Sequence, residues 1–168
     1  MESYQLVGAG NKGTIQIDDK TELQEMREKN IAIYGAGGFG RDVAWLVDTI
    51  ASSGKEIKVV CFIDDNPKIT GVIINNIEVM SFDLAVKKYP HCSVLSGIGV
   101  PKLRERTMTK ASGTSLHTTI SLIHPATEMS KWVTIGEGAV ICAGNILTTN
   151  VILRKYVQIN LDCTIGHD

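Results

Sequence analysis

The stretch that decides the fold runs from Glu128 to Ile165 and reads "EMSKWVTIGEGAVICAGNILTTNVILRKYVQINLDCTI". An apolar residue recurs at every sixth position, and the series starts just before this stretch. Its members are Ile123, Met129, Ile135, Ile141, Leu147, Leu153, Ile159 and Ile165. An α-helix has about 3.6 residues per turn and cannot keep one face at this period.

A second series lies two positions before each apolar residue from Met129 onward and contains small, short or β-branched residues. These are Thr127, Val133, Ala139, Asn145, Val151, Val157 and Cys163. Both series fit a solenoid of short strands, in which each strand supplies one inward aliphatic side chain before the chain turns a corner. The sequence therefore predicts a left-handed parallel β-helix of hexapeptide repeats over residues 117–168. This hand departs from the right-handed rule for parallel crossovers.

A glycine motif of the form G-x-G-x-x-G, "GAGGFG", precedes the repeats and contains Gly35, Gly37, Gly38 and Gly40. The strand-like "NIAIY" comes before it, and the segment 41–51 after it has the apolar stripe of a helix. A phosphate-binding loop needs this context, because the helix N-terminus supplies free N–H groups and a positive dipole end. An earlier match, "GAGNKG" at 8–13, is followed by the β-branched "TIQI", so we expect a hairpin turn there.

Further strands end in polar or glycine residues. The strand "IKVVCFIDD" ends in Asp64 and Asp65. Their distance along the chain from the glycine motif is the one at which nucleotide-binding folds place an acidic residue that binds a ribose. The strand "CSVLSGIG" ends in Gly97 and Gly99. A hairpin at "NN" (75–76), a helix capped by Ser81 and a helix begun by Pro101 are also predicted. Arg104 and Arg106 on that last helix could reach a phosphate, but we interpret them as charges on a solvated face.

These elements predict an α/β Rossmann-like domain over residues 30–116, with room for one mononucleotide-binding half. Residues 1–29 form an extension, interpreted as a hairpin and a linker, and residues 117–168 form the β-helix domain.

Composition and charge argue against several classes of function. The 168 residues carry a formal net charge of -1, which gives no basic surface for nucleic acid. No apolar run reaches the roughly 18 residues of a membrane span, and no secretory signal is visible, so we expect a cytoplasmic protein. The four cysteines lack C-x-x-C spacing, so we interpret them as reduced core thiols and expect no metal site.

The combination of motifs resembles the bacterial sugar acyltransferases, of the sialic-acid O-acetyltransferase type and of the UDP-4-amino-sugar N-acetyltransferase type that makes diacetylbacillosamine. The resemblance extends from residue 30 to residue 168. It rests on "IYGAGGFGRDV", "FIDD", "GIGVPKLRERT", "LIHPAT" and the repeats that run into "INLDCTIGHD".

This resemblance implies a nucleotide sugar, UDP-linked, as one substrate and acetyl-CoA as the acetyl donor beside the β-helix. The implied substrate-binding residues are Gly35, Gly37, Gly38, Gly40, Asp64, Asp65, Gly97 and Gly99. The implied catalytic residues are Asn160, His167 and Asp168, with His167 as general base and Asp168 as its partner. Many relatives carry a histidine or a short polar residue within the glycine loop, where this chain has Gly38 followed by Phe39.

The chemistry of acetyl transfer independently favours a histidine. An amine or hydroxyl that attacks a thioester must lose one proton, and an imidazole exchanges a proton near neutral pH. Two other functions stay open: an NAD(P)-binding oxidoreductase-like module, and a non-catalytic trimeric scaffold.

The repeats stop one residue after His167, whereas the resembling enzymes build most of their acetyl-CoA cleft from later coils, between the subunits of a trimer. We therefore expect these residues to be a fragment of a longer enzyme that is homotrimeric at full length. We expect its N-terminal domain to fold and to bind the nucleotide sugar, and these 168 residues not to transfer acetyl groups. The alternative is a natural short variant that borrows a cap from a partner.

Overall fold

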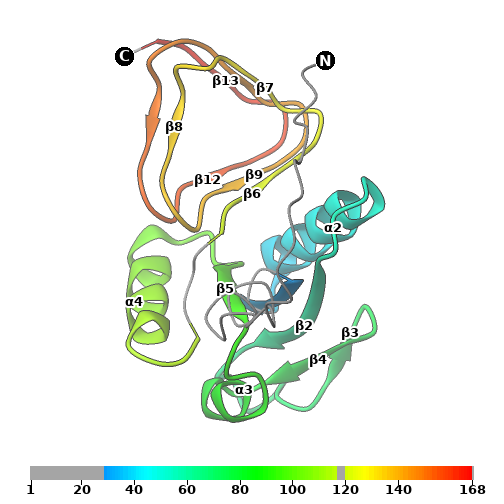
Figure 1. Ribbon diagram of the computed structural model, residues 1–168. Helices are drawn as coiled ribbons and strands as arrows, with labels where there is room; N and C mark the ends of the chain where they lie inside the picture. Colours follow the sequence, from blue (N-terminus) through cyan, green and yellow to red (C-terminus); the bar gives the residue numbers. More distant parts are fainter. Residues whose placement is uncertain (1–28, 117–119, 168) are drawn as a thin grey trace, which may run out of the picture.

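The computed structural model describes residues 29–116 and 120–167. Figure 1 shows two units, an α/β unit and, above it, a solenoid whose coils have a triangular outline. The hairpin and linker predicted for the N-terminal extension fall within residues 1–28, outside the described residues.

The α/β unit is built on one five-stranded sheet with the strand order β3-β4-β2-β1-β5. Its strands are β1 (Asn30–Tyr34), β2 (Lys58–Ile63), β3 (Ile73–Ile74), β4 (Ile77–Met80) and β5 (Ser93–Ser96). All neighbours are parallel except β3 and β4. The central strands carry apolar residues on both faces of the sheet, because helices cover both faces.

Among the described residues, three helices flank the sheet. The helix α2 (Gly38–Ser52) packs on one face against Ile31 and Ile33, whereas α3 (Phe82–Lys88) and α4 (Pro101–Ser112) pack on the other face against Ala32 and Tyr34. Alternate residues of β1 thus serve two separate cores, as the two-residue period of a strand requires. The parallel sheet with helices on both faces has the layers expected of the predicted α/β domain.

The local structure predicted for this unit is largely confirmed. Asn75 and Asn76 both have positive φ, of 49° and 64°, as a two-residue hairpin turn between β3 and β4 demands. The Ser81 hydroxyl accepts a hydrogen bond from the Leu84 N–H at 3.4 Å, and Pro101 is the first residue of α4. The helix α2 begins at Gly38, earlier than the predicted residue 41, because the last part of the glycine motif is itself helical.

The solenoid consists of eight two-residue strands that begin six residues apart. They are β6 (Leu122–Ile123), β7 (Glu128–Met129), β8 (Thr134–Ile135), β9 (Val140–Ile141), β10 (Ile146–Leu147), β11 (Ile152–Leu153), β12 (Gln158–Ile159) and β13 (Thr164–Ile165). Every strand pairs in parallel with the third one along the chain, which gives the sheets β6-β9-β12, β7-β10-β13 and β8-β11. The six-residue period is therefore confirmed strand by strand, and the left-handed sense stays a prediction.

Burial in the β-helix follows the predicted series. Ile141 and Leu147 are fully buried, whereas Met129, in the first coil, is 40% exposed because stacked coils cover only one side of it. The second series contains one buried polar residue, Asn145. Its Nδ2 donates to the carbonyl oxygens of Cys142 (2.7 Å) and Asn160 (2.8 Å), and its Oδ1 accepts from the Cys163 N–H (2.9 Å). These three bonds satisfy the buried amide.

The two units share a hydrophobic core. Leu122, Val140 and Cys142 of the β-helix belong to the same buried cluster as Val43 and Leu46 of α2. The sheet β6-β9-β12 therefore rests on α2, as the arrangement in Figure 1 also shows.

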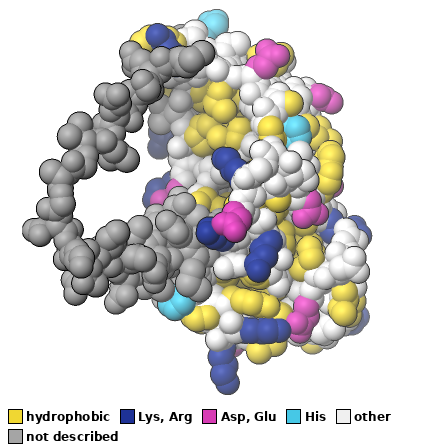
Figure 2. Space-filling view, turned by 45° about the vertical axis from the view of Figure 1, so that its right-hand side comes forward, with side chains coloured by type: hydrophobic (Ala, Val, Ile, Leu, Met, Phe, Trp, Pro, Cys, Tyr) yellow, Lys and Arg dark blue, Asp and Glu magenta, His cyan; other side chains and the backbone are white. Residues whose placement is uncertain are grey.

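On the molecular face in Figure 2, basic and acidic side chains are interspersed with hydrophobic ones. Within 29–116 and 120–167, no helix is both long and apolar enough to cross a membrane. The same residues include no cluster of three His, Cys, Asp or Glu side chains that could hold a metal ion.

Candidate functional site

The strand order reverses at β1. From β1 the chain crosses through α2 to β2 on one side, whereas β5 lies on the other side of β1. Open α/β sheets bind ligands at the carboxyl ends of the strands where the order reverses. The glycine motif follows β1, and the turn 97–99 follows β5, so both predicted glycine groups meet here. The Gly97 N–H donates to the Tyr34 carbonyl at 2.7 Å and ties the two strand ends together.

Three of the predicted glycines are required by close packing. A Cβ on Gly40 would clash with the Gly35 carbonyl, and one on Gly97 would lie 2.5 Å from the Gly40 Cα. Gly35 also has φ +106°, a conformation that side chains disfavour. Gly35, Gly40 and Gly97 therefore allow the glycine loop, the start of α2 and the end of β5 to touch.

The other three predicted glycines have open space around them. A Cβ on Gly37 or Gly99 would meet no described atom within 4 Å, and one on Gly38 would come no closer than 4.0 Å to the Arg41 guanidinium. Gly37 has φ -72°, which any residue adopts. Folding does not require glycine at Gly37, yet glycine leaves the backbone at the start of α2 bare. A bare helix N-terminus is a place where an anion can approach N–H groups closely.

Asp64 fastens the glycine loop to the end of β2. Its Oδ2 accepts a hydrogen bond from the Ala36 N–H at 3.3 Å, and its Oδ1 accepts one from the Asn66 N–H at 3.0 Å. Beside it lies a hollow of about 250 Å³. The lining residues are Tyr34, Gly35, Ile63, Asp64, Asp65, Asn66, Ile98, Leu103 and Thr107. The structure thus brings Gly35, Asp64 and Asp65 together, as predicted for one binding site.

Asp65 lines the same hollow, but its carboxylate is engaged within the fold. It accepts hydrogen bonds from the Tyr34 hydroxyl (2.9 Å), the Phe82 N–H (2.9 Å) and the Lys110 ammonium (3.3 Å). Burial by itself raises the pKa of Asp65, but these hydrogen bonds outweigh it and lower the pKa below its ordinary value. Burial and the neighbouring Asp65 raise the pKa of Tyr34. Asp65 therefore joins β1, β2, α3 and α4.

The predicted catalytic residues lie on the β-helix. Asn160 follows β12, is exposed, and accepts the Leu161 N–H at 2.8 Å. It lines a cavity of about 20 Å³ with Asp42 and Trp45 of α2, so the structure brings it to the helix that begins in the glycine loop. His167 is exposed, two residues after β13. Asp168 lies outside the described residues.

The interpretation of Arg104 as a solvated surface charge is wrong. Its guanidinium donates to the carbonyls of Ile98 and Gly99 in the second glycine turn and to the side chain of Gln158 on the β-helix. In the sequence, nothing distinguishes Arg104 from the exposed Arg106, because the distinction depends on where the β-helix docks.

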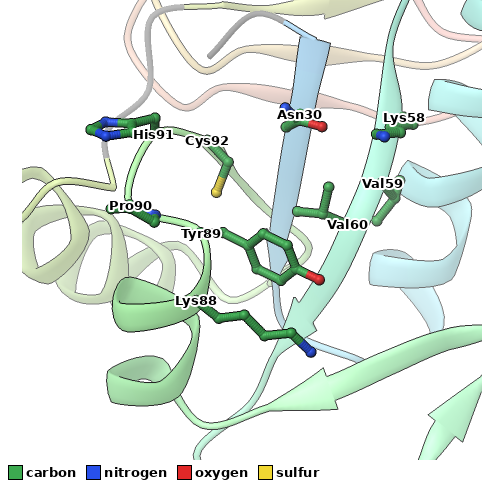
Figure 3. A pocket seen from close by; sticks show the side chains of 9 residues that line it. All are labelled: Asn30, Lys58, Val59, Val60, Lys88, Tyr89, Pro90, His91 and Cys92. Atoms are coloured by element: carbon green, nitrogen blue, oxygen red, sulfur yellow. The ribbon is translucent and has the colours of Figure 1, made fainter. Parts of the chain in front are cut away.

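A hollow of about 450 Å³, larger than the first, lies at the opposite, amino-terminal ends of the strands (Figure 3). Its walls come from the first residues of β1 and β2, including Asn30 and Lys58, and from the segment 88–92 before β5. The Lys88 ammonium there pairs with Glu78 at 3.1 Å. Because ligands of open α/β sheets bind at the carboxyl ends of the strands, this hollow is not the candidate site.

The chain is similar to known bacterial sugar acetyltransferases. The chain is 26% identical over 147 residues to the GDP-perosamine N-acetyltransferase of Escherichia coli O157:H7, covering 81% of this chain and 61% of the relative. The acetyltransferase domain of PglB from Neisseria gonorrhoeae FA1090, solved in complex with acetyl coenzyme A, superposes with a TM-score of 0.70 at 26% identity and covers 84% of this chain and 66% of its own. WeeI from Acinetobacter baumannii AYE gives 0.72 at 28% identity, with coverage of 83% and 65%.

This chain therefore spans less than two thirds of each of these proteins. The family model described as the PglD N-terminal domain matches residues 30–111, the part that contains the sheet and all the predicted glycines. The resemblance to bacterial sugar acetyltransferases predicted from the motifs is thus confirmed, and residues 30–111 of this chain match the PglD N-terminal domain family.

Proposed function

We propose that the α/β unit binds a nucleotide-linked amino sugar, and that the chain serves an enzyme that transfers an acetyl group from acetyl-CoA to the amine of that sugar. One observation carries the proposal. At the carboxyl ends of the strands where the strand order reverses, Gly37, Gly38 and Gly99 leave the backbone uncovered. The fold has room for a side chain at each of these positions and does not itself require glycine there. A bare backbone at a helix N-terminus suits a diphosphate.

The relatives support the chemistry. One of them is named for N-acetylation of GDP-perosamine, and another was solved with acetyl coenzyme A. Transfer to nitrogen is therefore favoured over transfer to oxygen. The UDP link predicted from the sequence stays a prediction, and a GDP link is the second candidate.

Within the site, each part has a proposed role. The diphosphate lies at the start of α2 against Gly37 and Gly38, and the nucleoside fills the hollow lined by Asp64 and Ile98. Asp64 keeps acceptor capacity for a ribose hydroxyl, because each of its oxygens accepts only one backbone N–H in the contacts described above. Gly97 acts indirectly, through packing.

The reaction needs one proton transfer. The amine attacks the thioester carbonyl, a carbon–nitrogen bond forms, and the carbon–sulfur bond breaks to release the CoA thiolate. His167 removes the proton from the attacking nitrogen and delivers it to the thiolate sulfur. The acetyl group passes directly from CoA to the amine, so no covalent enzyme intermediate is required. Asn160 and Asp168 are assigned to the same active-site run by the resemblance, with Asp168 fixing the imidazole tautomer.

Thermal stability with added ligands tests the proposal. A ligand that binds only the folded state raises the melting temperature. We expect GDP- or UDP-linked amino sugars to stabilise the protein, with NAD⁺ and NADP⁺ as matched controls. Stabilisation by NAD(P) alone would favour the oxidoreductase-like alternative, and stabilisation by none of them would favour the scaffold.

The atom that receives the acetyl group is tested on the product. NMR spectroscopy of the acetylated sugar distinguishes an amide from an ester, and an ester would contradict N-acetylation. Light scattering tests the homotrimer, which stays a prediction.

A further inference from the structure

Arg104 of α4 and Gln158 of β12 form a polar junction between the two units. The Arg104 Nη1 lies 3.0 Å from the Ile98 carbonyl oxygen, 3.1 Å from the Gly99 carbonyl oxygen and 2.7 Å from Gln158 Oε1. The other end of the same amide, Gln158 Nε2, donates to the Ser96 carbonyl at 2.8 Å. We call this group the Arg104–Gln158 clamp.

Both donors of the clamp hold backbone carbonyls of one short segment. Ser96 is the last residue of β5, and Ile98 and Gly99 form the glycine turn that follows it. The segment also bonds to itself, since the Ile98 N–H donates to the Ser96 hydroxyl at 3.2 Å. The turn is therefore held from outside by a residue that lies 62 positions away from Ser96 in the sequence.

The clamp borders the candidate nucleotide site. Ile98 lines the hollow together with Leu103 and Thr107, which are the neighbours of Arg104 on α4. The position of Ile98 also bears on Gly35, because a Cβ at Gly35 would lie 2.9 Å from the Ile98 side chain. A shift of the β-helix that moved Gln158 would thus move one wall of the hollow.

One nitrogen of Arg104 serves all three acceptors of the clamp. Nη1 carries two N–H donors, so at least one of them is shared between two acceptor oxygens, and the planar, permanently charged guanidinium keeps both donors in a fixed direction. The acceptors of Nη1 are two carbonyls and an amide oxygen, all neutral, so its positive charge remains beside the turn.

We propose that Arg104 and Gln158 are positioning residues that hold the 97–99 turn in its ligand-binding conformation and couple the seating of the β-helix to nucleotide binding. The inference rests on the proposed nucleotide site but not on acetyl transfer. Two consequences follow. Loss of either side chain weakens nucleotide binding, and it loosens the turn even when the protein stays folded.

The test measures the dissociation constants of GDP and UDP by isothermal titration calorimetry. We expect Gln158→Leu and Arg104→Lys to weaken binding about tenfold, the effect of one lost hydrogen bond of about 1.4 kcal/mol. Lys155→Met is the matched control, because Lys155 is an exposed β-helix cation that pairs with Glu137 at 2.7 Å. It should bind nucleotide like the wild type.

A rescue experiment separates positioning from general damage. Arg104→Ala removes the guanidinium, and free methylguanidinium added to this variant should restore affinity by taking its place. The same additive should leave the wild type and Lys155→Met unchanged. Hydrogen exchange of the 97–99 amides should be faster in Gln158→Leu and in Arg104→Ala than in the wild type. Methylguanidinium should slow this exchange in Arg104→Ala.

The outcomes are distinct. If the wild type binds neither GDP nor UDP, the proposed nucleotide site fails and the inference fails with it. If the wild type binds but folded Gln158→Leu and Arg104→Lys bind equally well, the clamp is merely structural and the inference is overturned, while the proposed function stands. Weakened binding without rescue by methylguanidinium would also contradict it.

Discussion

The site residues of the α/β unit and those of the β-helix are held by different kinds of contact. In the α/β unit, site residues are fixed by contacts between distant segments, such as the Ala36 N–H with Asp64 and the Gly97 N–H with the Tyr34 carbonyl. On the β-helix, Asn160 is exposed and bonds to the adjacent Leu161, and His167 is exposed as well. In the β-helix, the buried Asn145 side chain instead forms hydrogen bonds that link neighbouring coils.

This difference separates buried or partly buried residues that shape the fold from exposed residues to which function is assigned. Changes at Gly35, Gly40, Gly97 or Asn145 should damage structure. Changes at Gly37, Asn160 or His167 should leave structure intact and damage function. Four experiments can break or sharpen this division.

The largest contrast is expected within the glycine loop itself. Gly40→Val places a side chain against the Gly35 carbonyl, backbone that cannot give way, and should cost several kcal/mol, on the order of the whole stability of a domain. Gly37→Val has room and an allowed φ, so it should melt like the wild type but lose nucleotide binding.

Circular dichroism melts and calorimetric titration measure the two effects. Gly10→Val, in the first glycine motif, is the control and should bind nucleotide normally. Equal nucleotide binding by Gly37→Val and Gly10→Val would show that the wrong motif was chosen.

The next effect is catalytic. In a form of the enzyme that turns over, His167→Ala should lower the rate of acetyl transfer by about 10²–10⁴-fold, the range for a lost general base, with little change in acetyl-CoA affinity. CoA release measures the rate. His91→Ala, at an exposed histidine before β5, should keep the wild-type rate. A His167→Ala enzyme with most of its turnover would remove this residue from the mechanism.

A smaller effect on stability is expected inside the β-helix. Asn145→Leu leaves two carbonyls and one N–H without the partners that Asn145 supplies, and should cost about 2–4 kcal/mol of unfolding free energy. Urea denaturation measures it. Asn160→Ala removes only a local hydrogen bond at an exposed corner and should change stability by less than about 0.5 kcal/mol. Similar losses in both variants would contradict the division.

The smallest effect concerns acid stability. The folded-state pKa of Asp65 lies below its ordinary value of 3.8, so its carboxylate stabilises the fold above that value and the stabilisation disappears as the pH falls through the folded pKa. Asp65→Asn should therefore melt slightly lower than the wild type at neutral pH, and the difference should shrink below pH 3.8. Melting curves from neutral to acid pH measure it, and a difference independent of pH would exclude this origin.

The β-helix was the more predictable region because its period places each residue against its equivalents in the next coil. The six-residue series therefore located all eight strands, and the glycine motifs located both loops of the candidate site. The sequence could not reveal the bonds of Asp65 to Tyr34 and Lys110, or those of Arg104 to Gln158. These pairs join residues 31, 45 and 54 positions apart, and which side chains meet depends on how the sheet, the helices and the β-helix pack together.

The shared core of the two units has a consequence for the order of folding. A solenoid has difficulty starting, because its first coil has no neighbour on which to stack. Here Leu122 and Val140 pack into the core of α2, so the first coils form on a surface that the α/β unit supplies. We expect coil formation to spread from β6 and β9 toward β13, with the α/β unit as the nucleus. Pulsed hydrogen exchange during refolding would then show the amides of β9 protected before those of β13.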